Sequence, residues 1–523
     1  MEYIKKQMRC SRIGKSIVDQ FYLDEDVNVP DAKEDVKGII QGEGFVRIEE
    51  VREAEAHVTV SGKLLYHILY AAVGDEPKLS VLEGKLPVEE IIYIEKKENQ
   101  QIQIRPSRVE FSAALIHSRK VGIRAMIELE AVPEEIREEE NTVDIEVDAG
   151  EQLGLYKKKR NVNLLQMHTV KRDTYRVKEE FALPGAKESV REVLWTDITN
   201  QRLDIRIAPD ELRLRGELLV FVLYIGENEK TEWVEQTVTY EGSVACHGID
   251  ECMYQHVYAM LEEPLIEVRM DEDGEPRRIG VEATLDLKIH IYEEDAFELL
   301  EDVYSLKEQC EIETQTAVYE ELLLQNQSKC KVAERLVIPE MRTDVLQICH
   351  AAGTLQIDRE AVTEEGLVVE GAIHVAFLYI KADDASPFAC WQGMVPFSHI
   401  IEGQELSGDA IFDISSRVEQ LSVNLAGGEE VEVKAVLTFD TFVRRPQALQ
   451  VIKDVILSPR PMQEQEQMPG IVGYIAKEGD LLWDLAKKYL TTVDGIMEIN
   501  QLEKEEIKPG DRLLIFKENI SIL

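Results

Sequence analysis

The sequence predicts a multidomain protein, with three tandem, mainly β repeats followed by one small α+β module of βααβ order. Three observations support this fold class. Sequence markers recur at near-constant spacing through residues 1–458, and the recurring segments alternate apolar and polar residues as a β-strand does. Residues 471–518 place two short helical periods between two short strands. With 523 residues, 44% of them hydrophobic, the chain can form several hydrophobic cores.

The central marker of the repeat is a gapless segment that contains a glycine and closes on a tyrosine. It occurs at residues 61–70, 215–224 and 370–379. Its glycines, Gly62, Gly216 and Gly371, lie 154 and 155 residues apart. A proline upstream keeps both intervals, and a short apolar segment recurs downstream. We therefore expect three repeats, at residues 1–153, 154–308 and 309–458.

The secondary structure of each repeat is expected to be mainly strand. In the first copy Val58, Val60, Gly62 and Leu64 alternate with polar residues, which is the period of a half-buried strand. We expect each unit to be a β-sandwich or a partly open barrel, including a strand before its proline. The recurring glycine predicts a bulge or a close backbone approach rather than a ligand contact. Residues 294–307 fit either a helix or an extended connector.

The charge balance restricts the class of partner. The chain carries 101 acidic and 59 basic side chains, a net charge of −42. Such an excess disfavours nucleic acid and anionic membrane surfaces, and it fits a protein partner or a neutral polymer. We expect the basic run from Lys157 to Arg160 to lie in a solvated loop. The acidic runs Glu134-Glu135 and 138–140 are expected to be solvated charge.

The N-terminal residues and the cysteines indicate a cytoplasmic protein. Residues 1–18 lack the apolar stretch of a signal peptide, and no segment is long enough to span a membrane. Seven scattered cysteines without a CxxC pair fit reduced thiols. Cys246-His247, Cys252 and His256 form the densest group of potential metal ligands. Their spacing matches no common zinc pattern, so we expect no metal and no cofactor.

The repeats resemble a known domain. Their proline-led segment, their G-x-L-x-x-x-x-L/V-x-Y strand and their closing strand are similar to those of the SPOCS (spore coat structural) domain. The resemblance spans most of residues 1–460. It implies a mainly β structural domain of the bacterial endospore coat.

The end of the chain has a different pattern. Residues 459–470 are rich in proline, glutamine and glutamate and predict a linker. A strand through Val472 follows, and then a helix whose apolar face includes Leu485. Asp480 is the expected N-cap of this helix, and Thr491 with Asp494 resembles the capping box of a second helix. Asn500 is expected to end that second helix before a last strand through Phe516.

This order of elements closely resembles the LysM domain. The matching residues are Tyr474, Gly479, Asp480, Leu482, Trp483, Leu485, Ala486, Tyr489, Thr491, Thr492, Val493, Ile499, Asn500, Pro509 and Gly510. LysM domains bind N-acetylglucosamine polymers in a shallow groove between two loops. The resemblance implies that the groove of this chain contains Gly479, Asp480, Leu481, Leu482, Ile507, Lys508, Pro509 and Gly510. Trp483 is expected to be a core residue rather than a platform for a sugar.

Leu481 departs from the LysM pattern, in which glycan binders usually have Thr or Ser at this position. Loss of the hydroxyl removes a hydrogen bond to sugar, and the leucine adds apolar surface, which favours a protein partner. The alternative is that Leu481 packs back onto its own module.

No catalytic motif is found in the sequence, which lacks GxSxG, HExxH and P-loop patterns, so we expect a protein that is not an enzyme. SPOCS-like repeats followed by a C-terminal LysM resemble the SipL-type spore coat morphogenesis proteins. This resemblance implies a scaffold in the mother-cell cytoplasm, at the forespore surface. It also implies that LysM docks to the coat morphogenetic ATPase and that the scaffold helps to localise and encase the coat. The alternative is a protein that binds peptidoglycan or cortex glycan through LysM.

Overall fold

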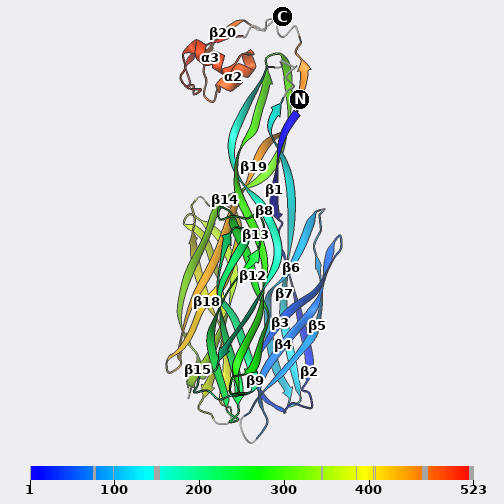
Figure 1. Cartoon of the computed structure of the whole chain (residues 1–523), viewed down its shortest axis with the longest axis vertical. Helices are drawn as coiled ribbons and strands as arrows, with labels where there is room; N and C mark the ends of the chain where they lie inside the picture. The colour runs from blue at the N-terminus through cyan, green and yellow to red at the C-terminus, as the bar shows by residue number, and fades with distance from the viewer. Residues whose placement is uncertain are drawn as a thin grey trace.

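The computed structural model describes residues 2–74, 78–97, 99–146, 154–342, 345–383, 386–404, 406, 408–461 and 469–517. The molecule is elongated: a wide body of β-sheets narrows into a stalk of paired strands, and the C-terminal module lies at the far end of the stalk (Figure 1). Most of the predicted linker, residues 462–468, lies outside the described residues. In the part of the chain that is described, no helix is long and apolar enough to cross a membrane.

The strands repeat in one order three times. The first set is β1 (Glu2–Ile13), β2 (Ile17–Asn28), β3 (Val36–Glu53), β4 (His57–Ala72), β5 (Leu79–Tyr93), β6 (Gln100–His117) and β7 (Lys120–Glu146). The second is β8 (Leu155–Ala182), β9 (Val190–Ala208), β10 (Glu211–Gly226), β11 (Thr231–Ala245), β12 (Tyr254–Met270) and β13 (Pro276–Ser305). The third is β14 (Glu308–Val337), the 3₁₀ turn η1 (Pro339–Met341), β15 (Val345–Thr363), β16 (Gly366–Lys381), β17 (Phe388–Glu402), β18 (Ile411–Gly427) and β19 (Glu430–Pro459).

Each repeat is a sandwich of two antiparallel sheets, which decides between the two predicted architectures. A three-stranded sheet (β3-β4-β5, β9-β10-β11 or β15-β16-β17) packs on a second sheet built around a long strand, β7, β13 or β19. Alternation places one side of the strands in the core between the sheets, except for β1, whose buried residues lie in the stalk. The strand expected before each proline is present as β2 and as the end of β8. The second sheets of repeats two and three join through β8 and β14.

The recurring glycines mark close contacts, as predicted. A Cβ atom at Gly62 would lie 2.2 Å from the carbonyl oxygen of Arg47, and one at Gly371 would lie 2.0 Å from that of Gln356. At Gly216 the Cβ would meet the ring of Tyr240 at 2.2 Å. The pairing register shifts beside Gly62 and Gly371, so a bulge in the neighbouring strand presses its backbone against the glycine.

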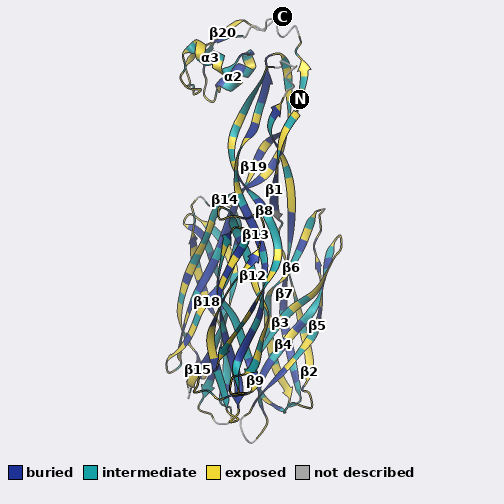
Figure 2. Ribbon diagram, viewed as in Figure 1, coloured by how far each residue is buried: buried dark blue, intermediate teal, exposed yellow. Residues whose placement is uncertain are grey.

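The three repeats lie side by side around a common axis. Near the base of the body, away from the stalk, their three-stranded sheets share one hydrophobic core, which we call the central core. Its buried members are Leu69, Leu79, Val81, Leu194, Trp195, Phe221, Leu223, Ile225, Cys349, Leu378 and Phe388. Because every repeat contributes to it, the repeats form one body rather than a string of independent domains. Buried residues occur along the strands throughout the body (Figure 2).

The stalk consists of one antiparallel strand pair from each repeat, in which the first strand pairs with the last: β1 with β7, β8 with β13, and β14 with β19. Its buried residues come from all three pairs, for example Met8, Leu164 and Tyr319. Two sequence expectations are settled here. The basic run from Lys157 to Arg160 is not a loop but part of β8, where Lys157 and Lys159 pair with Asp144. Of residues 294–307, those up to Ser305 belong to β13 and are extended.

Where the stalk enters the body, charged groups are buried. The guanidinium of Arg444 is 0% exposed and donates to Glu320 at 2.8 Å and to Asp413 at 2.6 Å. Glu134 of the first repeat is also buried and accepts from Lys288 of the second at 2.9 Å. The prediction that Glu134-Glu135 is solvated charge is therefore wrong, because both residues are buried and Glu134 pairs with a residue of another repeat.

Candidate functional site

The C-terminal module has the predicted βααβ order. Its elements are β20 (Ile471–Ile475), α2 (Leu482–Tyr489), α3 (Val493–Asn500) and β21 (Arg512–Phe516). The two strands pair antiparallel, and a small core forms around buried residues of both helices and β21. Three apolar residues one helical turn apart, Leu482, Leu485 and Ala486, are buried, so the amphipathic pattern of α2 was predicted correctly.

The helix ends differ from the prediction by about one residue. The N-cap of α2 is Leu481 and not Asp480, and that of α3 is Thr492, whose hydroxyl accepts from the amide of Gly495. The left-handed residue after α3 is Gln501. Asn500 is instead the last helical residue, and its side-chain amide bonds both the amide and the carbonyl of Leu514 in β21. At Asn500, hydrogen bonds to β21 thus replace the left-handed cap that the sequence suggested, whereas the cap of α3 by Thr492 is local.

The predicted groove is built from two matched turns of sequence Lys-x-Gly-Asp, at residues 477–480 and 508–511. Gly479 and Gly510 have φ of +87° and +95°, the left-handed conformation that a type II turn requires at its third position. In each turn the aspartate carboxylate accepts the amide of the lysine at 2.8 Å. Asp480 also accepts the hydroxyl of Tyr474 at 2.8 Å. It closes the turn instead of capping α2.

Ala476 holds the two turns side by side. Its amide donates to the carbonyl of Asp511 at 2.9 Å, and its carbonyl accepts the amide of Gly510 at 2.8 Å. Because Ala476 directly precedes the first turn, these bonds bring residues about thirty positions apart in the chain to one edge of the module. The structure therefore brings the two predicted loops together.

The predicted groove residues divide into exposed and buried side chains. Gly479, Lys508, Pro509 and Gly510 are exposed. Leu481 is 49% exposed, so it does not pack back fully onto its module. Leu482 is buried in the core of the module and Ile507 packs against that core, so these two side chains stabilise the module and are not available to a partner in the way that the exposed residues are. Among the predicted groove residues, the accessible surface is therefore formed by the two turns and the Leu481 side chain.

Helix α2 attaches the module to the stalk. The indole N–H of Trp483 donates to Asp302 at 2.8 Å, and the ammonium of Lys487 lies 2.7 and 2.9 Å from the two oxygens of the same carboxylate. The hydroxyl of Tyr304 donates to the carbonyl of Thr491 at 2.9 Å. Tyr304 is 1% exposed and meets Trp483 edge to face. Trp483 therefore packs at an interface with the stalk.

Sequence patterns did not indicate Asp302 or Tyr304 as contacts of the module. An available signal was the recurrence of Asp followed by Ile or Val near the end of each repeat, at residues 144, 302 and 454. That recurrence marks the position but does not reveal that the module binds at only one of the three copies.

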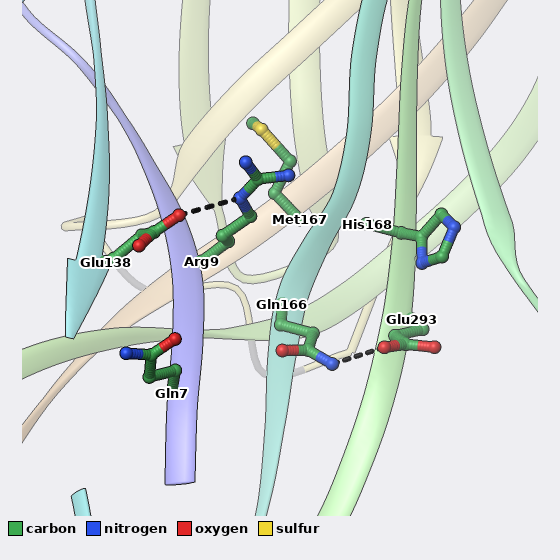
Figure 3. A pocket seen from close by; sticks show the side chains of 7 residues that line it. All are labelled: Gln7, Arg9, Glu138, Gln166, Met167, His168 and Glu293. Carbon is green, nitrogen blue, oxygen red and sulfur yellow. Dashed lines mark hydrogen bonds and ion pairs between the residues drawn. The ribbon is translucent and has the colours of Figure 1, made fainter. Parts of the chain in front are cut away.

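Hollows elsewhere on the molecule have polar linings. One lies at the base of the stalk, between strands of the first and second repeats (Figure 3). Arg9 pairs there with Glu138 at 3.3 Å, and the side-chain amide of Gln166 donates to Glu293. A second hollow lies between β9 and the third repeat, where Arg417 donates to the carbonyl of Leu203 at 3.1 Å. The polar groups named here bond to one another, within a repeat in the first hollow and between the second and third repeats in the second hollow.

The cysteine–histidine group does not assemble. Cys246 lies in the core of the second repeat, Cys252 is exposed, and His256 is buried beside Tyr258 and Phe442. Among the described residues, no group of histidine, cysteine, aspartate and glutamate side chains is arranged to hold a metal ion. All seven cysteines are free thiols.

Comparison with known proteins identifies both domain types. The family described as "SipL, SPOCS domain" matches residues 189–269 and 344–426, which cover β9 to β12 and β15 to β18. The LysM domain family matches residues 474–516. The first repeat shares the strand order of the other two but lies outside the SPOCS matches. No curated protein and no solved structure matches the chain.

These matches confirm the combination of domains that the sequence suggested. Both matched families are non-catalytic binding domains, and together they fit a protein of the sporulation coat. The mainly β repeats and the small module with two turns facing solvent agree with that assignment. The chain therefore has the SipL-type architecture, in which SPOCS domains precede a C-terminal LysM domain.

Proposed function

We propose that this protein is a non-enzymatic scaffold of the endospore coat that acts in the mother-cell cytoplasm at the forespore surface. Its LysM domain docks to the coat morphogenetic ATPase, and the body of repeats helps to localise and encase the coat. The SPOCS and LysM matches support the link to the coat.

One observation carries the choice of a protein partner. Leu481 is 49% exposed and directly follows the first turn, at the position where glycan-binding LysM domains usually have a hydroxyl. Covering an exposed leucine with a partner lowers the free energy of the complex, whereas the leucine side chain can form no hydrogen bond with a sugar. Lys508 and Pro509 of the second turn are exposed too, so the predicted groove residues offer a partner both apolar and charged side chains.

The second candidate function is binding of peptidoglycan or cortex glycan. The two matched turns favour it, because they bring together the two loops between which LysM domains bind N-acetylglucosamine polymers. The exposed Leu481 argues against it.

Co-purification from sporulating cells tests the proposal. Full-length chain, chain lacking residues 471–523, and the variant Leu481→Asp are compared for retention of the ATPase and for localisation at the forespore. Leu346→Asp is a matched control, because Leu346 is an exposed leucine in the third repeat. Loss of the ATPase with the first two changes and not with the control supports docking through LysM. Unchanged partners after deletion would refute it, and saturable retention of the purified chain on peptidoglycan would favour the glycan function.

A further inference from the structure

Each strand pair of the stalk carries an aspartate at the same structural position. The strand pairs shift register just before Asp144, Asp302 and Asp454, so a β-bulge precedes each of the three. Each carboxylate accepts the amide of the next residue, at 2.7, 2.8 and 2.8 Å. Bulges redirect side chains and are frequent beside functional positions. The three aspartates are thus equivalent in backbone setting and differ in what they bind.

Two of the equivalent carboxylates are occupied within the stalk. Asp144 accepts Lys157 at 2.5 Å and Lys159 at 2.9 Å, and Asp454 accepts the hydroxyl of Tyr3. Asp302 alone of the three bonds the LysM domain, through Trp483 and Lys487. The aspartate position that the three repeats share therefore anchors the LysM domain to the stalk in the second repeat.

The anchor is reinforced by packing. Tyr304, two residues after Asp302 on the same side of β13, stacks on Tyr156 at 5.1 Å and meets Trp483 edge to face at 4.9 Å. Tyr304 and Leu306 are buried in the same core as the LysM helices. Apolar burial and a carboxylate with two donors together hold α2 in one orientation.

The anchor and the groove share one helix. Leu481, the exposed groove residue, is the N-cap of α2, and Trp483 follows it by two positions. Trp483 and Lys487 are four residues apart, hence on one face of α2, and both bond Asp302. A displacement of α2 from the stalk would therefore move the support of the first groove turn.

We propose that Asp302 of the second repeat is a positioning residue for LysM recognition, which presets the groove by clamping α2 to the stalk. This inference rests on the proposed docking function of the groove. Clamping and partner binding are then linked. Release of α2 from the stalk lowers the affinity for the partner, and the bound partner stabilises the contact between α2 and the stalk by the same free energy. A coupling of ordinary size corresponds to a change of about 5- to 100-fold in partner affinity.

The test uses the full chain with Asp302→Ala and Asp302→Asn. The asparagine keeps an acceptor for the indole of Trp483 but loses the ion pair with Lys487. Glu301→Ala is the matched control, because Glu301 is the adjacent carboxylate on β13 and pairs with Lys158 at 3.1 Å. The two readouts are hydrogen exchange of the α2 amides and the Kd for the purified coat ATPase.

The expected order of α2 protection and of affinity is wild type and Glu301→Ala highest, Asp302→Asn lower, and Asp302→Ala lowest. Unchanged α2 exchange in Asp302→Ala would show that the clamp does not hold the domain, and would overturn the inference. Faster exchange with unchanged Kd would also overturn it, because docking would then not preset the groove. If no variant and not even wild type binds the ATPase, the proposed function fails, whereas the exchange readout still tests the clamp.

Discussion

The imidazole of His350 lies face to face with the ring of Phe221, with ring centroids 4.1 Å apart and planes inclined by 10°. Phe221 belongs to the second repeat and His350 to the third, so this stack joins the two at the central core. Asp197 and Glu235, which flank Phe221 in its sheet, bond the two ring nitrogens at 2.8 and 2.7 Å. An equivalent stack of His67 on Trp195 joins the first repeat to the second.

His350→Ala is expected to lower the free energy of unfolding by about 3 kcal/mol, because it removes a buried ring that packs on Phe221 and leaves Asp197 and Glu235 without their shared cation. Chemical denaturation followed by circular dichroism measures the loss. His57→Ala, a change on the same type of sheet but away from the central core, should cost much less. Equal losses in the two variants would contradict this role for His350.

Stability should fall as pH rises from about 6.5 to about 9. Burial alone would lower the pKa of His350, but its bonds to Asp197 and Glu235 outweigh this and raise the pKa to about 9. A raised histidine pKa contributes stability that is complete below the unfolded value near 6.5 and is lost as pH rises through 9, about 3 kcal/mol in all.

Glu43, from β3, acts in the same direction. Burial, and to a smaller extent the charge of Asp197, raises the pKa of Glu43 to about 8. The folded state therefore keeps this proton more tightly than the unfolded state does. The stability that the protonated carboxyl contributes is complete below pH about 4.5, the unfolded pKa, and is lost as pH rises to about 8. Thermal melts between pH 6 and 9.5 should show a falling Tm, with a shallower fall in His350→Gln. An identical slope in that variant would exclude His350 as a source.

Gly62→Ala should destabilise the first repeat by about 1–3 kcal/mol, because the new Cβ would lie 2.2 Å from a backbone oxygen and the strands must separate. Gly38→Ala is a suitable control, since Gly38 is in the adjacent strand β3 and open space surrounds its Cβ position. Urea titrations of both variants give the comparison. If the two alanines are tolerated equally, the glycine does not mark a tight contact.

Arg444→Met should cost about 3–5 kcal/mol, because it leaves Glu320 and Asp413 buried without a cation. Arg445→Met provides the matched change one residue away. Arg445 is partly exposed and pairs with Glu321, so its loss should cost no more than about 1 kcal/mol. Differential scanning fluorimetry separates the outcomes, and similar Tm values for the two variants would argue against the buried triad.

Leu481→Thr should weaken binding of the purified coat ATPase by about 5-fold, since covering a half-exposed leucine is worth about 1 kcal/mol. The new hydroxyl should increase retention on peptidoglycan. Biolayer interferometry and peptidoglycan sedimentation measure the two effects. Leu346→Thr should change neither, and a gain in ATPase affinity on replacing Leu481 would count against the apolar contact.

Local patterns were sufficient to predict the β-rich repeats and the βααβ order of the last module, because alternation and helical period arise from neighbouring residues. The groove turns were also within reach, since each Lys-x-Gly-Asp segment specifies its own geometry. The clamp was not, because Asp302 and Trp483 are separated by 181 residues and neither stands out from its surroundings. The burial of Glu134 was missed for the same reason, as the covering strands belong to other repeats.

The shared core of the stalk has a consequence for biosynthesis. Met8 of β1 is buried together with Tyr319 of β14 and Val451 of β19, which are the first and last strands of the third repeat. β1 is synthesised before β14 and β19 and therefore cannot reach its final environment until both have been made, in contrast to proteins whose domains fold one after another. Removal of any single repeat would open a core that the other two depend on, so the tandem copies cannot be lost or exchanged one at a time.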